Sequence, residues 1–156
     1  MGEPARILVV DDDEGIRKTL ATILEDQGYV VDTAENGKEA IEKSNIKFYN
    51  LALIDIRLPD MEGTKLLASM KETTPKMVKI IVTGYPALQN AVEAVNKDAD
   101  GYLLKPVNID VLLATIEEHL KKQQEAKKYS EEKVTEFIET RAREMEATTG
   151  KKHRSE

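Results

Sequence analysis

The stretch that decides the fold is LALIDIRLPDMEG, residues 51–63. Four apolar residues, Leu51 to Ile54, lead directly into the carboxylate of Asp55, and a turn signal follows at residues 58–60. A short apolar run bounded by turn residues is typical of a strand that is buried on both faces. Taken alone, Asp55 is most simply interpreted as a residue that closes the turn. However, in an open α/β sheet, ligands bind just beyond the carboxyl ends of the strands, which is where Asp55 stands.

The rest of the chain continues this alternation of strand and helix. Strands are predicted at residues 7–10, 29–34, 51–54, 78–82 and 101–104, and helices at residues 13–27, 36–44, 62–72, 86–95 and from 108 onward. Alternation of this kind predicts an α/β fold, in which a doubly wound five-stranded parallel sheet is covered by five flanking helices on its two faces. In the flavodoxin-like strand order 2-1-3-4-5, the ligand site falls between the first and third strands.

Four of the five predicted strands end in polar side chains, which are Asp11 with Asp12, Asp55, Thr83 and Lys105. The strand order places the Asp11–Asp12 pair beside Asp55 and the other two groups at their flank. Crowded carboxylates suit a hard divalent cation such as Mg²⁺, and a lysine with a hydroxyl suits a phosphoryl group. Asp55 is then a candidate nucleophile that forms an acyl phosphate. Each of these residues, taken alone, can be explained as a helix cap, a turn residue or a surface residue. Since polar side chains of this kind follow four separate strands, a single shared site is the better interpretation.

The motifs ILVVDDD, LALIDIRLPDMEG, IIVTGY and GYLLKP resemble those of response-regulator receiver domains of two-component signal transduction. They occur in the family's order and spacing over roughly residues 5–122. The resemblance implies that Asp55 accepts a phosphoryl group from a sensor histidine kinase in a Mg²⁺-dependent reaction. It implies metal ligands at Asp11, Asp12, Asp55 and the backbone carbonyl of Arg57. A signalling phosphoacceptor of this kind is not an enzyme with a separate substrate, since it catalyses only its own phosphorylation and dephosphorylation.

The same resemblance assigns the remaining site residues. Thr83 and Lys105 would bind the phosphoryl group, and the Lys105–Pro106 peptide bond would be cis, as is frequent in the family. Tyr102 matches the aromatic residue that follows a shift of Thr83. The face formed by the fourth helix, the last strand and the last helix would then control a downstream protein or dimerisation. Arg57 and Tyr85 occupy the positions that tune phosphoryl lifetime in the family.

Two other functions compete with this interpretation. Asp11-Asp12-Asp13 fits the Asp-x-Asp pattern of haloacid-dehalogenase-like phosphatases, although Gly15 stands where that family has threonine or valine and the body is short for it. A phosphorylation-independent binding module is the second alternative, and the complete set of acids, threonine and lysine argues against it. Within the receiver resemblance, Asp98 replaces the usual glycine before the fifth strand.

Composition narrows the class of protein further. The 156 residues suffice for one domain and a modest extension, and the absence of cysteine excludes disulfides and thiolate catalysis. No apolar run approaches the roughly 18 residues of a membrane span, and MGEPAR is not a signal segment, so we expect a cytoplasmic protein without membrane contact. Residues 1–120 carry 13 basic and 21 acidic side chains. An acidic body of this kind argues against broad nucleic-acid binding.

The C-terminal part predicts a helical extension. We expect a receiver domain at residues 1–122, a helix at residues 123–150 and a disordered tail at residues 151–156. The helix is either continuous with the preceding one or broken near Tyr129-Ser130, and Gly150 is its expected end. No DNA-binding domain is visible, so the chain is either a stand-alone receiver or a piece of a longer regulator. An apolar stripe is expected to dock on the receiver's own last helices or across a homodimer, and its members are Val134, Phe137, Ile138, Ala142 and Met145.

Overall fold

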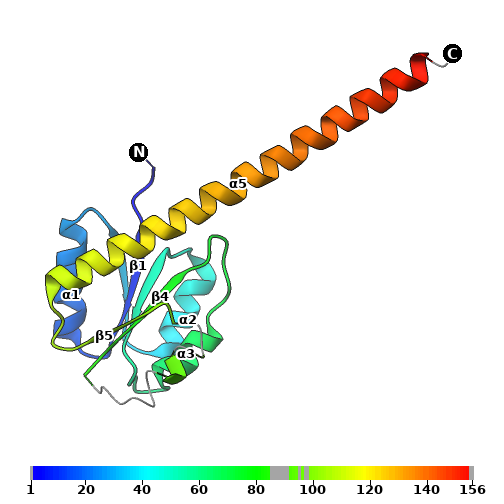
Figure 1. The fold of residues 1–156 in the computed structure, drawn as a ribbon. Helices are drawn as coiled ribbons and strands as arrows, with labels where there is room; N and C mark the ends of the chain where they lie inside the picture. Colours follow the sequence, from blue (N-terminus) through cyan, green and yellow to red (C-terminus); the bar gives the residue numbers. More distant parts are fainter. Residues whose placement is uncertain (1, 85–91, 95, 97–98, 155–156) are drawn as a thin grey trace.

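Five parallel strands form a single sheet in the computed structural model, which describes residues 2–84, 92–94, 96 and 99–154 (Figure 1). The strand order is β2-β1-β3-β4-β5, which confirms the predicted topology. The strands are β1 (Arg6–Val10), β2 (Val30–Ala34), β3 (Leu51–Ile54), β4 (Val78–Thr83) and β5 (Gly101–Leu104). β3 lies at the centre with β1 and β4 on either side, so the residues that follow these three strands are brought to one edge of the sheet.

Helices cover both faces of the sheet. Their bounds are α1 (Glu14–Asp26), α2 (Gly37–Ile46), α3 (Gly63–Ser69) and α5 (Ile109–Arg154), and residues 92–94 and 96 are also helical. Alternate strand residues point to opposite faces. Ile7 and Val9 of β1 therefore pack with α1 and α5, whereas Leu8 and Val10 pack with α2 and α3. The predicted first turn of the fourth helix at Pro86 and its residues Ala91 and Val95 lie outside the described residues, as does Asp98.

Local sequence signals set the ends of α1. The Asp13 side chain accepts a hydrogen bond from the backbone N–H of Ile16 at 3.0 Å, which caps the first turn. Gly28 has a φ of 93°, a left-handed conformation that glycine adopts without strain just after a helix. Both signals were readable in the sequence. In contrast, α3 ends at Ser69, earlier than the predicted Glu72, because the backbone of Met70 is already extended.

Helix α5 is one continuous helix of 46 residues, so of the two sequence-based alternatives the break near Tyr129-Ser130 is wrong. It also runs through Gly150 to Arg154, where the sequence pattern indicated an end and then a disordered tail. A single glycine lowers helix stability by only about 1 kcal/mol, which does not by itself end a helix. No helix among the described residues is long and apolar enough to cross a membrane.

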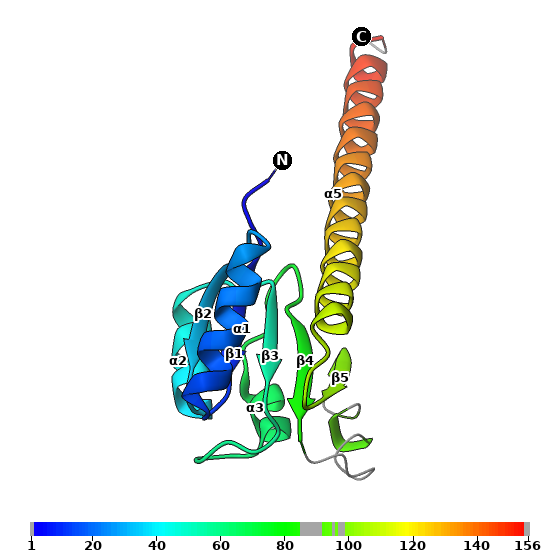
Figure 2. The same cartoon turned by 90° about the vertical axis from the view of Figure 1, so that its left-hand side faces the viewer.

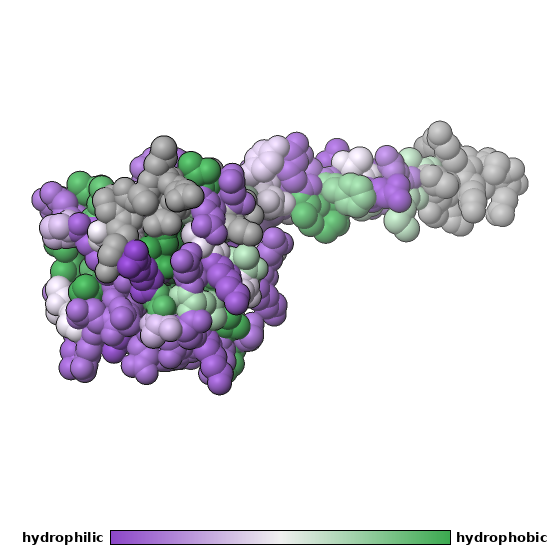
Figure 3. All heavy atoms as spheres, turned by 90° about the horizontal axis from the view of Figure 1, so that it is seen from below, coloured by the Kyte–Doolittle hydropathy of each residue, from purple (hydrophilic) through white to green (hydrophobic). Residues whose placement is uncertain are grey.

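The second half of α5 stands clear of the receiver (Figures 1 and 2). Val134, Phe137, Ile138 and Met145 retain 58%, 65%, 60% and 70% of their accessible surface. In the space-filling view, apolar side chains lie exposed between hydrophilic ones on this segment (Figure 3). The expected docking of the stripe onto the receiver's own last helices is therefore wrong, since the continuous helix carries the stripe away from the domain.

Candidate functional site

The ends of β1 and β3 bring two aspartates together. Val10 pairs with Ile54 in the parallel register, so Asp11 and Asp55 are the next residues on adjacent strands. The backbone N–H of Asp55 donates to the carbonyl of Val10 at 2.9 Å, which continues the ladder by one residue. Both side chains are buried, with relative exposures of 3% for Asp11 and 7% for Asp55. The sheet thus holds two buried carboxylates side by side at the ends of adjacent strands.

Asp12 completes a cluster of three carboxylates. One oxygen from each of Asp11, Asp12 and Asp55 lies within 4.8 Å of the other two, and Asp12 is exposed while the other two are buried. Oxygen-only sets of this kind are what Mg²⁺ and Ca²⁺ bind, and Mg²⁺ prefers one or two carboxylates together with water and phosphate oxygens. The donor set and its opening to solvent at Asp12 fit a hard divalent cation.

Lys105 lies across the two buried aspartates. Its Nζ is 2.6 Å from Oδ2 of Asp11 and 3.1 Å from Oδ2 of Asp55. The residue follows β5, and its backbone N–H donates to the carbonyl of Thr83 at 2.8 Å, which ties the ends of β4 and β5 together. The Lys105–Pro106 peptide bond is cis, as the family resemblance implies. The predicted lysine therefore points into the acidic cluster rather than into solvent.

Burial and charge shift the protonation of these groups. Burial raises the pKa of Asp55, the hydrogen bond and charge of Lys105 oppose that rise, and the negative charge of Asp11 adds to it. For Lys105, burial lowers the pKa, but the hydrogen bonds and charges of Asp11 and Asp55 outweigh it, so the pKa is raised. Lys105 is thus held as a cation, and it offsets the repulsion between the two aspartates.

Two neighbouring groups that no sequence pattern indicates orient Asp11. The guanidinium of Arg17 donates to the backbone carbonyl of Asp11 at 2.7 Å, and the N–H of Asp13 donates to the Asp11 carboxylate at 2.9 Å. Arg17 lies one turn into α1, so its reach to the end of β1 depends on how the helix packs on the sheet. The Asp13 side chain caps α1, which leaves it outside the cluster and argues against the phosphatase interpretation, where it would act on substrate.

The loop after Asp55 is held at two further points. The Asp60 carboxylate accepts hydrogen bonds from the N–H groups of Gly37 and Lys38, at 2.8 and 2.9 Å, so it caps α2 from a distant part of the chain. The Gly63 N–H donates to the carbonyl of Ile56 at 2.7 Å, which turns the loop back onto the strand end. In sequence, Asp60 was recognisable only as a turn residue.

Thr83 and Tyr102 lie on adjacent strands and point to the same face of the sheet. Tyr102 pairs with Ile81, two residues before Thr83, and side chains two residues apart share a face. Thr83 is fully buried, and Tyr102 packs against the core cluster on the α2–α3 side. Among the described residues, the buried Tyr102 hydroxyl has no hydrogen-bond partner, and burial raises the pKa of Tyr102.

The family resemblance assigns two residues to the tuning of phosphoryl lifetime, and the structure describes one of them, Arg57. The backbone N–H of Arg57 donates to Oδ1 of Asp55 at 3.3 Å, so Arg57 borders the cluster. The role of its carbonyl as a metal ligand stays a prediction. Tyr85 lies outside the described residues, and its proposed role stays a prediction as well.

The fold and this cluster define the class of protein: a parallel α/β domain with a carboxylate and lysine centre at its strand ends. The family model described as the response regulator receiver domain matches residues 7–117. The chain therefore belongs to the receiver-domain family of two-component response regulators. This result supports neither the phosphatase nor the phosphorylation-independent alternative.

Similarities to individual proteins support the same family assignment. The chain is 40% identical over 119 residues to the transcriptional regulatory protein ZraR of Klebsiella oxytoca, an alignment that covers 76% of this chain and 27% of that protein. It is similar to a receiver domain protein of Methanospirillum hungatei JF-1, with 47% identity, a TM-score of 0.76 and coverage of 79% and 98%. A beryllofluoride-activated NtrC4 receiver domain dimer gives 36% identity, a TM-score of 0.71 and coverage of 76% and 98%. The chain spans between a quarter and a third of the curated relatives' length.

Proposed function

We propose that Asp55 accepts a phosphoryl group from a phosphohistidine of a sensor kinase and forms an acyl phosphate. The observation that carries this proposal is the position of Lys105, whose ammonium lies between the Asp55 and Asp11 carboxylates at 3.1 and 2.6 Å. A buried lysine at this point neutralises charge where a dianionic or trianionic group would arrive. Asp55 is the central carboxylate, since β3 lies between β1 and β4.

In the proposed step, one Asp55 carboxylate oxygen attacks the phosphorus atom. The bond from phosphorus to the histidine nitrogen breaks as the new oxygen–phosphorus bond forms, and the histidine leaves as neutral imidazole after taking up a proton. The Arg57 N–H, 3.3 Å from Oδ1, helps to hold the Asp55 carboxylate in position. Lys105 pairs with the incoming phosphoryl oxygens, and Thr83 donates its hydroxyl to them. Positioning and charge neutralisation supply most of the catalysis in such transfers.

We propose that Asp11, Asp12, Asp55 and the carbonyl of Arg57 hold Mg²⁺. A bound Mg²⁺ would neutralise the negative charge that develops on the phosphoryl oxygens. Support comes from the three carboxylates within 4.8 Å of one another and from the exposed position of Asp12. Asp12 would provide the open side of the site, where water and phosphate oxygens complete the coordination.

A small phosphodonor tests the acceptor directly. Incubation with an acyl phosphate donor and Mg²⁺ is expected to add one phosphate to the wild-type protein, measured by intact mass. Asp55→Asn keeps the shape and removes the nucleophile, so it is expected to gain none. Asp26→Asn, an exposed change at the end of α1, is the matched control and should label like wild type. Equal labelling of Asp55→Asn would show that another residue accepts the phosphate.

We further propose that Thr83 and Tyr102 form the switch. If Thr83 moves to bind the phosphoryl group, it vacates space on the face that it shares with Tyr102. The Tyr102 hydroxyl, which is buried without a hydrogen-bond partner among the described residues, would lose nothing by moving. Phosphodonor with Mg²⁺ should therefore perturb amide resonances along β5, in addition to those around the acidic cluster. A response confined to the cluster would exclude this switch.

We propose the binding partners of this chain from the family to which it belongs. A sensor histidine kinase would supply the phosphoryl group, and the switched face would bind a downstream protein or a second copy of the chain. The curated relatives are transcriptional regulatory proteins, of which this chain matches only the receiver part. Pull-downs with phosphorylated protein and with Asp55→Asn are expected to differ in the protein that they retain. An identical set of retained proteins would contradict phosphorylation-controlled binding.

A further inference from the structure

The chain between Asp55 and α3 forms a closed hairpin, which we call the β3–α3 hairpin (residues 56–63). Arg57 pairs with Glu62 in an antiparallel bridge near the base of this hairpin. The base adjoins the acidic cluster, because the Arg57 N–H donates to Oδ1 of Asp55 at 3.3 Å. Since the bridge links the two sides of the hairpin, a displacement of its tip at residues 58–61 is passed on to Arg57.

The tip of the hairpin is anchored to the start of α2 by Asp60. The first N–H groups of a helix have no partner within the helix. In α2, the Asp60 carboxylate accepts from the N–H groups of Gly37 and Lys38. The Asn36 side chain accepts from the next one, that of Glu39, at 2.8 Å. The two backbone hydrogen bonds lower the pKa of Asp60, which keeps it an anion beside the positive end of the helix dipole.

Met61 gives the tip a second, apolar contact with α2. A Cβ atom added at Gly37 would lie 2.4 Å from the Met61 sulfur, so the thioether lies directly against the backbone of the helix. Met61 also packs against the core cluster on the α2–α3 face. The hairpin tip is therefore held by one charged and one apolar side chain, both of them against the first turn of α2.

Both sides of the contact between the hairpin and α2 lead back to the acidic cluster. On one side, α2 follows β2, whose last residue, Ala34, accepts a hydrogen bond from the N–H of Asp11 at 3.1 Å. On the other side, the hairpin leads to Arg57 and Asp55. Asp60 thus closes a ring of contacts around the ends of β1, β2 and β3, although it lies outside the cluster of three carboxylates itself.

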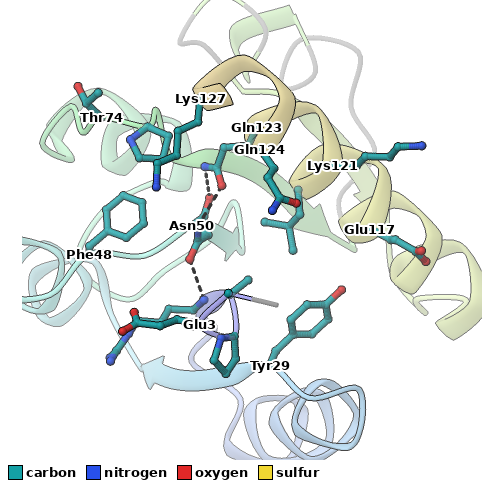
Figure 4. A pocket seen from close by; sticks show the side chains of 16 residues that line it. Glu3, Tyr29, Phe48, Asn50, Thr74, Glu117, Lys121, Gln123, Gln124 and Lys127 are labelled. Atoms are coloured by element: carbon teal, nitrogen blue, oxygen red, sulfur yellow. Dashed lines mark hydrogen bonds between the residues drawn. The ribbon is translucent and has the colours of Figure 1, made fainter. Parts of the chain in front are cut away.

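The opposite ends of β1 and β3 are fixed by separate contacts. The N–H of Arg6 in β1 donates to the side chain of Asn50, just before β3, at 2.9 Å. Figure 4 shows the side chains of Asn50 and Gln123 joined by a hydrogen bond, which ties these strands to α5. These contacts involve neither the hairpin nor α2, so variants at the two ends of the sheet can be compared.

We propose that Asp60 is a positioning residue, which fixes the hairpin so that the acidic cluster is prepared to bind a divalent cation. The inference rests on the Mg²⁺ site proposed above, to which Arg57 would contribute its carbonyl. A ligand that the fold already holds in place loses less conformational freedom when the cation binds. Removing groups that orient metal ligands typically weakens metal binding by about 10- to 100-fold. Because coupling is reciprocal, the bound cation must also stabilise the contact between Asp60 and α2.

Titration with Mg²⁺ alone, followed by amide resonances, tests the inference. Asp60→Asn keeps the size of the side chain but removes its charge and one acceptor oxygen, so it is expected to weaken Mg²⁺ binding about tenfold. Glu62→Gln is the matched control, since it removes one charge from the same hairpin at a side chain that makes no cap hydrogen bond with α3. It should bind Mg²⁺ nearly as tightly as wild type. Equal weakening in the two variants, or no weakening in Asp60→Asn, would overturn the positioning role.

Two further variants separate positioning from stability. Asn36→Ala removes the other side-chain cap of α2, and Gln123→Ala loosens the far end of the sheet, so both should lower the midpoint of thermal unfolding. Both leave the hairpin and its Asp60 anchor in place, so both should keep the wild-type affinity for Mg²⁺. If either variant weakened Mg²⁺ binding as much as Asp60→Asn does, the loss would follow from general destabilisation, and the positioning role would be wrong.

Amide exchange measures the reciprocal effect in the unphosphorylated protein. Mg²⁺ is expected to slow the exchange of the Gly37 and Lys38 N–H groups in wild type and to leave it unchanged in Asp60→Asn. Unchanged exchange in a wild type that binds Mg²⁺ would contradict the coupling while leaving the cation site intact. If wild type does not bind Mg²⁺, the proposed cation site fails, and this inference fails with it.

Discussion

A Cβ atom added at Gly63 would lie 2.3 Å from the backbone carbonyl oxygen of Asp55 and 2.9 Å from the Cα of Ile56. Real side chains do not approach backbone atoms this closely. The first residue of α3 is therefore pressed against the strand end that carries the proposed phosphoacceptor. Only a residue without a side chain allows the loop to turn back in this way.

Gly63→Ala is expected to displace the backbone at Asp55, destabilising the protein by about 1–3 kcal/mol and slowing phosphorylation. The measurements are chemical denaturation and the rate of labelling by the phosphodonor. Gly15→Ala is the control, since its Cβ meets only the end of the Asp13 side chain, at 3.2 Å, in an exposed first turn. If Gly63→Ala labels at the wild-type rate, the close approach does not position Asp55.

Lys105→Met is expected to make the protein depend more on divalent cations. The change leaves the buried Asp11 and Asp55 carboxylates facing each other, so the protein should lose about 1–3 kcal/mol of stability in metal-free buffer. Mg²⁺ would then restore more stability to the variant than it adds to wild type, because no lysine shares the neutralisation. Thermal unfolding with and without Mg²⁺ measures this difference. Lys122→Met, at an exposed surface lysine, should show the wild-type response.

Tyr49→Phe is expected to reduce stability in a pH-dependent manner. The buried Tyr49 hydroxyl donates to the Asp32 carboxylate at 2.6 Å, and this hydrogen bond lowers the pKa of Asp32, with help from Lys47. A carboxyl whose pKa is lowered on folding stabilises the protein above its unfolded pKa of about 3.9, and that contribution is lost as the pH falls through the folded value.

The wild type should therefore exceed Tyr49→Phe by about 1–2 kcal/mol near neutral pH, and the difference should shrink below about pH 4. Urea unfolding at several pH values is the measurement. Tyr129→Phe, at an exposed position, should match wild type throughout. A difference that stays constant down to pH 2 would mean that the hydroxyl acts through packing rather than through Asp32.

Gln123→Ala is expected to loosen the start of the extension from the receiver. The side chain accepts from the Asn50 amide at 3.1 Å and donates to two backbone carbonyls, so its loss should cost about 1–2 kcal/mol. Gln124→Ala is a matched control, since the neighbouring glutamine is exposed. Amide exchange at residues 120–130 should rise in Gln123→Ala alone. Equal exchange in the two variants would show that the apolar contacts of α5 suffice to hold it.

The sequence alone determined the order of strands and helices, because apolar periodicity, the Asp13 cap and Gly28 act over only a few residues. It also identified Asp11, Asp12, Asp55, Thr83 and Lys105, since a parallel sheet brings successive strand ends to one edge. The individual roles assigned to these residues stay predictions that the experiments above address.

Tertiary structure alone decided how these residues meet. Lys105 bridges two aspartates, and Asp60 caps a helix that begins 23 residues earlier. The bond between Asn50 and Gln123 joins positions 73 residues apart. Tertiary structure also decided the direction in which α5 extends. The sequence predicted the apolar stripe of this helix but not that the stripe is exposed. Contacts between distant positions depend on how whole elements pack, and local periodicity holds no information about that packing.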